Sequence, residues 1–117
     1  MEVSKEEISR VLMEFDIPEY FVGFSFLVEA LSYMVAQENK PGTMKVYKHV
    51  ADKFNTYDMR VERNIRRCIE KAWGSNKTNI MQQKYFKGIY GVNDYPRNGQ
   101  FLQMMRTYLR SETFLKK

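Results

Sequence analysis

The chain has 117 residues, enough for one hydrophobic core, so we expect a single domain over residues 1–117. Its hydrophobic content of 44% and aromatic content of 15% exclude an intrinsically disordered chain. It has no 18-residue apolar run, no signal peptide and only one cysteine, which argues against a membrane span, export and an internal disulfide. We therefore expect a cytoplasmic protein with no membrane partner.

The net charge of +5 is distributed unevenly. Residues 1–42 carry 3 basic and 8 acidic side chains, residues 43–73 carry 8 and 4, and residues 74–117 carry 8 and 2. An acidic first third beside a basic remainder suggests a polarised surface whose basic side meets a polyanion. Charge alone also fits a basic protein that binds nothing anionic.

The first half of the chain predicts three helices. Ser4 and Glu7 have the spacing of a capping box, and the helix they begin should stop before Pro18. A second, more buried helix is expected over about 19–37 and is broken by NKPG. Thr43 is expected to cap a third helix that runs to Phe54. The residues of this helix expected to face inward are Val46, Tyr47, Val50, Ala51 and Phe54.

The second half predicts three more. A fourth helix is expected over about 58–73, ended by Gly74, and a weaker fifth over 78–86. GIYGVNDYPRNG has the composition of a loop, after which Asn98 should cap a last helix over about 99–113. The residues of the last helix expected to face inward are Phe101, Leu102, Met105, Tyr108 and Leu109. The predicted fold class is an all-α bundle of about six helices.

Residues 43–73 have the spacing of a helix–turn–helix. Only a few residues separate the third and fourth helices, which forces a sharp crossing. Ala51 is small where the two helices must approach closely, and Asn55 stands where the turn needs a left-handed backbone. Val61 would pack the second helix back on the first. These three positions together predict the motif.

The helix expected over 58–73 has two contrasting faces. Its apolar face carries Val61, Ile65, Cys68, Ile69, Ala72 and Trp73, and the opposite face carries Arg63, Arg66, Arg67 and Glu70, flanked by Arg60. Since the first turns of the second helix of a helix–turn–helix enter the major groove, Arg60, Glu62 and Arg63 are candidates for reading base edges of double-stranded DNA. The candidates for phosphate contacts are Arg66, Arg67, Lys45, Lys48 and Thr56. The alternative is a solvated face with ordinary i,i+4 ion pairs.

The sequence offers little for catalysis. His49 is the only histidine, so a metal site or a Ser–His–Asp triad lacks the partners it needs. Cys68 and Trp73 are expected to pack in the core. No phosphate-binding loop or carboxylate pair stands out, so we expect no enzyme activity, no metal and no cofactor. The aromatic residues of QQKYFKGIYG suit either stacking on single-stranded nucleic acid or closing the core by Tyr85, Phe86 and Tyr90.

VYKHVADKFNTYDMRVERNIRRCIEKAW resembles the DNA-binding effector domain of the master response regulator of sporulation initiation in endospore-forming bacteria. The motifs that carry the likeness are KFNT at 53–56, RVER at 60–63 and CIEKAW at 68–73, and IPEYFVGFSFLVEAL and YPRNGQFLQM extend it to about residues 15–110. The resemblance implies a six-helix, response-regulator effector fold with a helix–turn–helix. It also implies transcription regulation through a short GTCG-containing box, often bound by tandem copies.

By the same resemblance, Arg60, Glu62 and Arg63 match the base-reading residues, and Arg66 matches a further DNA contact. The family's regulator also carries a receiver domain, for which this chain has no room, so we expect either part of a longer regulator or a free-standing effector. The family also contacts an RNA polymerase sigma factor, through a segment that differs here at 75–91 and contains an insertion. The alternative function is therefore an interaction protein that modulates a full-length sporulation regulator or RNA polymerase, with DNA binding lost or secondary.

Overall fold

The computed structural model describes residues 3–75, 79–86 and 95–111. These residues form six α-helices and no strand. In chain order the helices are α1 (Lys5–Glu14), α2 (Val22–Ala36), α3 (Thr43–Lys53), α4 (Asp58–Ser75), α5 (Ile80–Phe86) and α6 (Asn98–Leu109). The predicted all-α fold of about six helices is confirmed. Within the described residues, no helix has both the length and the apolar character needed to cross a membrane.

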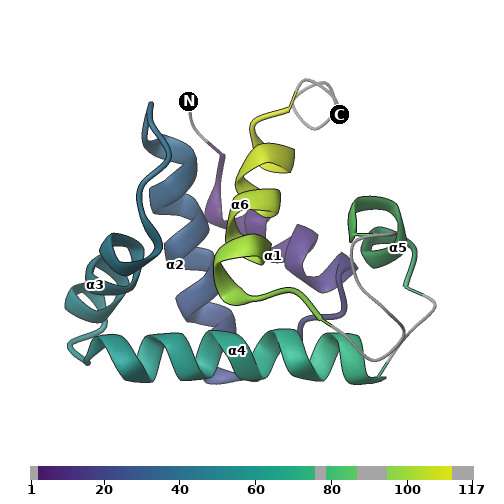
Figure 1. Cartoon of the computed structure of the whole chain (residues 1–117), viewed down its shortest axis with the longest axis horizontal. Helices are drawn as coiled ribbons and strands as arrows, with labels where there is room; N and C mark the ends of the chain where they lie inside the picture. Colours follow the sequence, from purple (N-terminus) through teal and green to yellow (C-terminus); the bar gives the residue numbers. More distant parts are fainter. Residues whose placement is uncertain (1–2, 76–78, 87–94, 112–117) are drawn as a thin grey trace.

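The longest helix, α4, lies along one side of the molecule (Figure 1). The turn after α3 leads into its N-terminal end, while α5 lies near its C-terminal end. One continuous core joins the helices. The largest fully buried side chains are Phe15, Phe101, Ile8, Leu12, Leu27, Leu31, Met34, Ile65, Ile69, Leu102, Met105 and Leu109. Because each such side chain contributes about 1.5–3 kcal/mol when buried, this core dominates the stability of the fold.

The start and end of α1 follow from local chemistry. The Ser4 Oγ accepts from the Glu7 backbone N–H at 3.1 Å, and the Glu7 carboxylate accepts from the Ser4 backbone N–H at 3.2 Å. The helix ends at Glu14. Two residues later Asp16 has a φ of 64°, and the Ile17 N–H bonds back to the Leu12 carbonyl at 3.1 Å. The predicted capping box and the stop before Pro18 are both confirmed.

Several helix boundaries differ from the prediction. The helix α2 begins at Val22 rather than near residue 19, and α4 continues through Gly74 to Ser75. Gly42 occupies the cap position of α3, so Thr43 is its first helical residue rather than its cap. Gly42 and Thr43 are adjacent, and both residue types occur at helix N-caps. The sequence pattern therefore locates the start of α3 only to within one residue.

The structure also differs from the predictions for Asn98, for the end of α6 and for Phe54. Asn98 is the first residue of α6 rather than its cap, because its amide is engaged by other helices, and α6 ends at Leu109 rather than near residue 113. Phe54 is 42% exposed instead of facing the core, and its ring makes an edge contact with Phe26 at 5.1 Å. The four other inward predictions for α3 and all five for α6 are confirmed.

Two arginines attach α6 to the end of α2. The Arg106 Nε donates to the Met34 carbonyl at 2.8 Å, and the Arg110 Nη1 donates to the Val35 carbonyl at 2.6 Å. Both guanidinium groups also reach the Gln37 carbonyl, at 2.8 and 3.1 Å. Since the last carbonyls of a helix lack partners within it, these bonds satisfy α2 and hold α6 in place.

Candidate nucleic-acid interface

The turn between α3 and α4 is closed by backbone hydrogen bonds. The Thr56 N–H donates to the Ala51 carbonyl at 2.8 Å, and the Asn55 N–H donates to the Asp52 carbonyl at 3.4 Å. Asn55 has a φ of 54°, the left-handed conformation predicted for it. Ala51 is 2% exposed, consistent with a close approach of the two helices. The structure therefore contains the predicted helix–turn–helix geometry.

One face of α4 anchors it to the core. Val61, Ile65, Cys68, Ile69 and Ala72 are all fully buried, as predicted. At the C-terminal end of the helix, Trp73 packs edge-on against Phe86 and Phe101, with ring centroids 5.3 and 5.9 Å apart. Burial raises the pKa of the Cys68 thiol to about 12, which agrees with a core residue rather than a reactive one.

The opposite face of α4 presents basic side chains to solvent. Arg60, Arg63 and Arg67 are exposed and recur three or four residues apart, so they share this outward face. The side-chain amide of Asn64 donates to the Arg60 carbonyl at 2.8 Å, within the same helix. The long guanidinium groups project from a backbone that the core holds rigidly, which suits contact with a large anionic surface.

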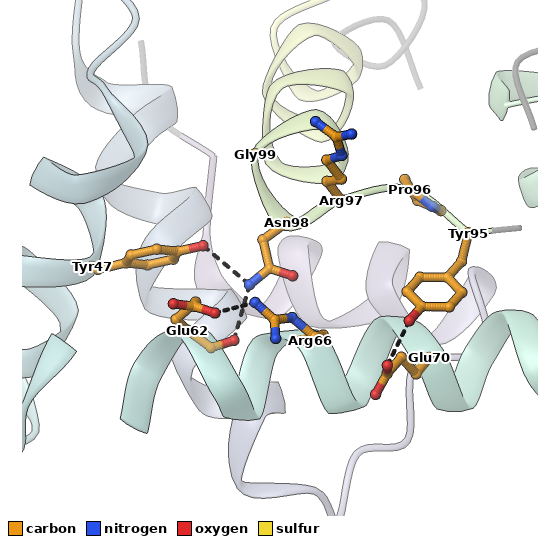
Figure 2. Close-up of a pocket in the computed structure, with 9 residues that line it drawn as sticks. All are labelled: Tyr47, Glu62, Arg66, Glu70, Tyr95, Pro96, Arg97, Asn98 and Gly99. Carbon is orange, nitrogen blue, oxygen red and sulfur yellow. Dashed lines mark hydrogen bonds and ion pairs between the residues drawn. The ribbon is translucent and has the colours of Figure 1, made fainter. Parts of the chain in front are cut away.

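Glu62 and Arg66 lie on the flank of α4 that faces α6 rather than on the outward face. Their side chains form an ion pair along the helix (Figure 2). They line an open groove of about 640 Å³ between α3, α4 and the start of α6. Its residues are Tyr47, Glu62, Arg66, Glu70, Tyr95, Pro96, Arg97, Asn98 and Gly99. Glu62 thus lies on the groove flank of the same turns of α4 that carry Arg60 and Arg63 on the outward face.

The candidate phosphate contacts outside α4 differ in exposure. Lys45 and Lys48 are exposed on α3, three residues apart. Thr56 is half-buried in the turn, and its backbone N–H is already bonded to Ala51, so a phosphate contact would have to use its side chain. The two lysines thus add exposed positive charge on α3, the first helix of the helix–turn–helix.

Two residues of this region were missed as site residues by sequence reasoning. The amide of Asn98, which is 7% exposed, donates to the Tyr47 hydroxyl at 3.1 Å and to the Glu62 carbonyl at 2.9 Å (Figure 2). The Tyr95 hydroxyl donates to the Glu70 carboxylate at 2.6 Å. All three partners are more than 20 residues distant in the chain, so no local pattern could have revealed these contacts.

The pKa values of the two tyrosines reflect these contacts. Burial raises the pKa of Tyr47, while the Asn98 hydrogen bond partly offsets that rise. The hydrogen bond to Glu70 raises the pKa of Tyr95, because the negative carboxylate favours the protonated phenol. The positive charge of Arg66 acts to lower the pKa of both tyrosines, so Arg66 interacts electrostatically with both.

His49 belongs to a different cluster, which joins α1, α2 and α3. Its Nε2 lies 2.8 Å from the Glu29 carboxylate, and the Lys5 ammonium lies 2.8 Å from the other oxygen. The ring of Tyr33 stacks on the imidazole with centroids 4.0 Å apart. Burial tends to raise the pKa of Glu29, but its hydrogen bonds with Lys5 and His49 outweigh burial and lower it. No group of residues in the described parts of the chain could hold a metal ion.

The fold and this surface define a class: an all-α helix–turn–helix protein whose second helix carries an exposed basic face. Comparison with known families agrees. The sequence model described as "Sporulation initiation factor Spo0A C terminal" matches residues 8–109. The chain therefore belongs to the family of the C-terminal domain of sporulation initiation factor Spo0A, a DNA-binding domain of a transcription regulator. The resemblance seen in the motifs around KFNT and RVER is confirmed.

Proposed function

We propose that this protein is a sequence-specific regulator of transcription that inserts residues 59–71 of α4 into the major groove of a GTCG-containing DNA box. The observation that carries the proposal is the outward face of α4. Its arginines are exposed on a helix whose other face is fully buried, directly after a tight turn from α3. An exposed helix of this kind fits the width of the major groove.

Base recognition falls to the first two turns of α4. Arg60 and Arg63 can each donate two parallel hydrogen bonds to guanine O6 and N7, and the Glu62 carboxylate can accept from cytosine N4. A GTCG box offers guanine and cytosine on both strands. The three side chains therefore suit the composition of the box that the family resemblance implies.

Phosphate contacts fall to residues beside these three. Arg67 follows Arg63 by four residues on the same face, while Lys45 and Lys48 are exposed on α3 and Thr56 lies in the turn. Arg66 can add a contact from the groove side of α4. Such contacts fix the position of the protein without reading sequence.

Fluorescence anisotropy with a labelled GTCG-box duplex and a scrambled duplex of equal length tests the proposal. We expect the protein to bind the box more tightly, and Arg60→Ala to lose much of that preference. Arg10→Ala, an exposed arginine on α1, is the matched control and should keep the preference. Equal affinity of the unaltered protein for both duplexes would contradict the proposal and favour the alternative of an interaction protein that modulates a full-length regulator or RNA polymerase.

The family also suggests tandem binding and contact with an RNA polymerase sigma factor. Tandem binding predicts that a duplex with two direct repeats takes up two copies more readily than two separate boxes do. The segment expected to carry the sigma-factor contact, 75–91, falls partly outside the described residues, at 76–78 and 87–91, and its described part includes α5. Co-purification of the protein with the sigma factor on box DNA tests that contact.

A further inference from the structure

The segment from Tyr95 to Asn98, at the start of α6, meets α4 at two points. Asn98 bonds to the Glu62 carbonyl, and Tyr95 bonds to the Glu70 carboxylate two turns further along (Figure 2). Arg66 lies between them, four residues after Glu62 and four before Glu70. The segment therefore contacts α4 on its groove side at both ends of the stretch from Glu62 to Glu70.

Asn98 acts on the backbone of α4. Its amide nitrogen reaches both the Tyr47 hydroxyl on α3 and the Glu62 carbonyl on α4, and the residue is almost fully buried. The helix that carries Asn98 is itself held to α2 by Arg106 and Arg110. Asn98 thus links α6, which is held to α2, to both helices of the helix–turn–helix. Its contact on α4 is the backbone of Glu62, whose side chain is proposed to read cytosine.

Tyr95 acts on the side chain of Glu62 through two charged groups. Arg66 has a carboxylate four residues away on either side, and i,i+4 pairs of opposite charge lie within reach on a helix. In the structure Arg66 pairs with Glu62, while Glu70 accepts from the Tyr95 hydroxyl. The hydroxyl therefore satisfies the competing carboxylate, and Arg66 is left to hold Glu62.

We infer that Tyr95 and Asn98 are positioning residues that hold Glu62 in the orientation needed to recognise its base. Asn98 sets the backbone at Glu62, and Tyr95 directs Arg66 to the Glu62 carboxylate. A base-reading group held in place before DNA arrives loses less freedom on binding, so its hydrogen bond discriminates more strongly. The inference rests on the proposed function, in which Glu62 reads a base.

The test measures affinity for the GTCG box and for boxes altered at one base pair at a time. The position read by Glu62 is defined as the one at which Glu62→Ala loses discrimination. We expect Asn98→Ala and Asn98→Asp to reduce discrimination at this same position by roughly five- to tenfold, part of the range for a full base contact. Aspartate has nearly the shape of asparagine but cannot donate to the Glu62 carbonyl.

The matched control is Asn79→Ala. The Asn79 amide also bridges separate elements, since it donates to the Glu14 carbonyl and the Asp16 carboxylate, both at 2.8 Å, and its oxygen accepts from the Gln82 N–H. It touches none of the base-reading candidates. Its loss should lower stability without changing discrimination at any base pair.

A second pair of variants tests the side-chain step independently of the buried amide. Tyr95→Phe removes one oxygen and should release Glu70 to compete for Arg66, with a loss of discrimination of about twofold, the effect of one i,i+4 ion pair. Adding Glu70→Gln removes the competing charge and should restore discrimination. Tyr20→Phe, at an exposed tyrosine, is the control.

The outcomes separate the inference from the proposed function. If the unaltered protein discriminates but the Asn98 and Tyr95 variants keep its discrimination, the inference is overturned and the proposed function stands. A uniform loss of affinity for every duplex also overturns it, since that result reports a purely structural role. If the unaltered protein does not distinguish the box from scrambled DNA, the proposed function fails first.

Discussion

A methyl group added to Gly23 would lie 2.2 Å from the backbone carbonyl oxygen of Asn64 and 2.7 Å from the Cys68 Sγ. The backbones of α2 and α4 therefore touch where only a glycine fits. This contact limits how closely α2 and α4 can approach, on the side of α4 that packs on the core. It gives α4 a rigid backing that the side-chain pattern of α4 does not reveal.

Gly23→Ala should destabilise the protein by about 2 kcal/mol or more, because the obstructing atom is backbone and one of the two helices must move. Urea unfolding measures the change. Gly74→Ala is the control: an added Cβ meets nothing within 4 Å, and alanine favours a helix, so this variant should be neutral or up to about 1 kcal/mol more stable. Equal effects of the two substitutions would argue against the close contact.

Asn55→Ala should cost about 1–2 kcal/mol, because alanine disfavours the left-handed conformation that the turn requires. Asn55→Gly should leave the free energy of unfolding nearly unchanged, since glycine adopts this conformation without strain. Thermal unfolding followed by circular dichroism compares the two variants. If alanine is tolerated as well as glycine, the turn does not depend on the left-handed residue.

Glu29→Gln should flatten the dependence of stability on pH. The lowered pKa of Glu29 means that its interactions with Lys5 and His49 contribute fully above its ordinary value of 4.5 and disappear as the pH falls through the lowered folded value. The difference in unfolding free energy between the protein and this variant should therefore be largest near neutral pH and shrink below about pH 4.5.

Urea titrations at pH 7 and in the acidic range measure that difference. Glu19→Gln, at an exposed carboxylate, serves as the control and should change stability by less than about 0.5 kcal/mol at either pH. A gap between the protein and Glu29→Gln that stays constant on acidification would contradict the assignment.

Cys68 should resist alkylation in the folded protein. At pH 8 a thiol with a pKa of about 12 contains on the order of 1,000-fold less thiolate than an ordinary cysteine, and burial adds a steric barrier. Iodoacetamide labelling followed by mass spectrometry should be slow in buffer and fast in concentrated urea. Rapid labelling of the native protein would place the thiol at the surface.

Lys45→Ala and Arg63→Ala should weaken DNA binding in different ways. Loss of a phosphate contact at Lys45 should lower affinity for all sequences about equally and reduce the salt dependence by about one unit of slope. Loss of Arg63 should cost about 1–3 kcal/mol chiefly at one base pair. Titrations at several salt concentrations, with Arg10→Ala as the charge-matched control, distinguish them. An identical pattern for both variants would refute this division of roles.

Local patterns were enough to predict most of the fold. The helices, the turn at Asn55 and the buried face at Val61 and Ile65 depend on properties that each residue carries with it: backbone preference, capping chemistry and apolar periodicity. These act over a few residues, so the sequence contains them in readable form. The motif around RVER added the family, which the match over residues 8–109 confirms.

Some local patterns are compatible with more than one structure, and there tertiary packing determined the outcome. Asn98 has the local signature of a helix cap, yet its amide bonds to Tyr47 and Glu62, because the placement of α6 brings these groups within reach. Phe54 has the spacing of a core residue, but the chain turns away there and leaves it partly exposed. Where the local sequence allows two environments for a side chain, the packing of distant segments determines which one it occupies.

The sequence by itself thus determined the helices, the helix–turn–helix and the basic character of α4, since these follow from short-range preferences. Only the tertiary structure determined that Glu62 faces a groove with Arg66, that Tyr95 and Asn98 border it, and that Gly23 backs the helix. The Tyr95–Glu70, Asn98–Glu62 and Gly23–Asn64 contacts join residues 25, 36 and 41 positions apart, and their energies exist only once the core has brought the helices together.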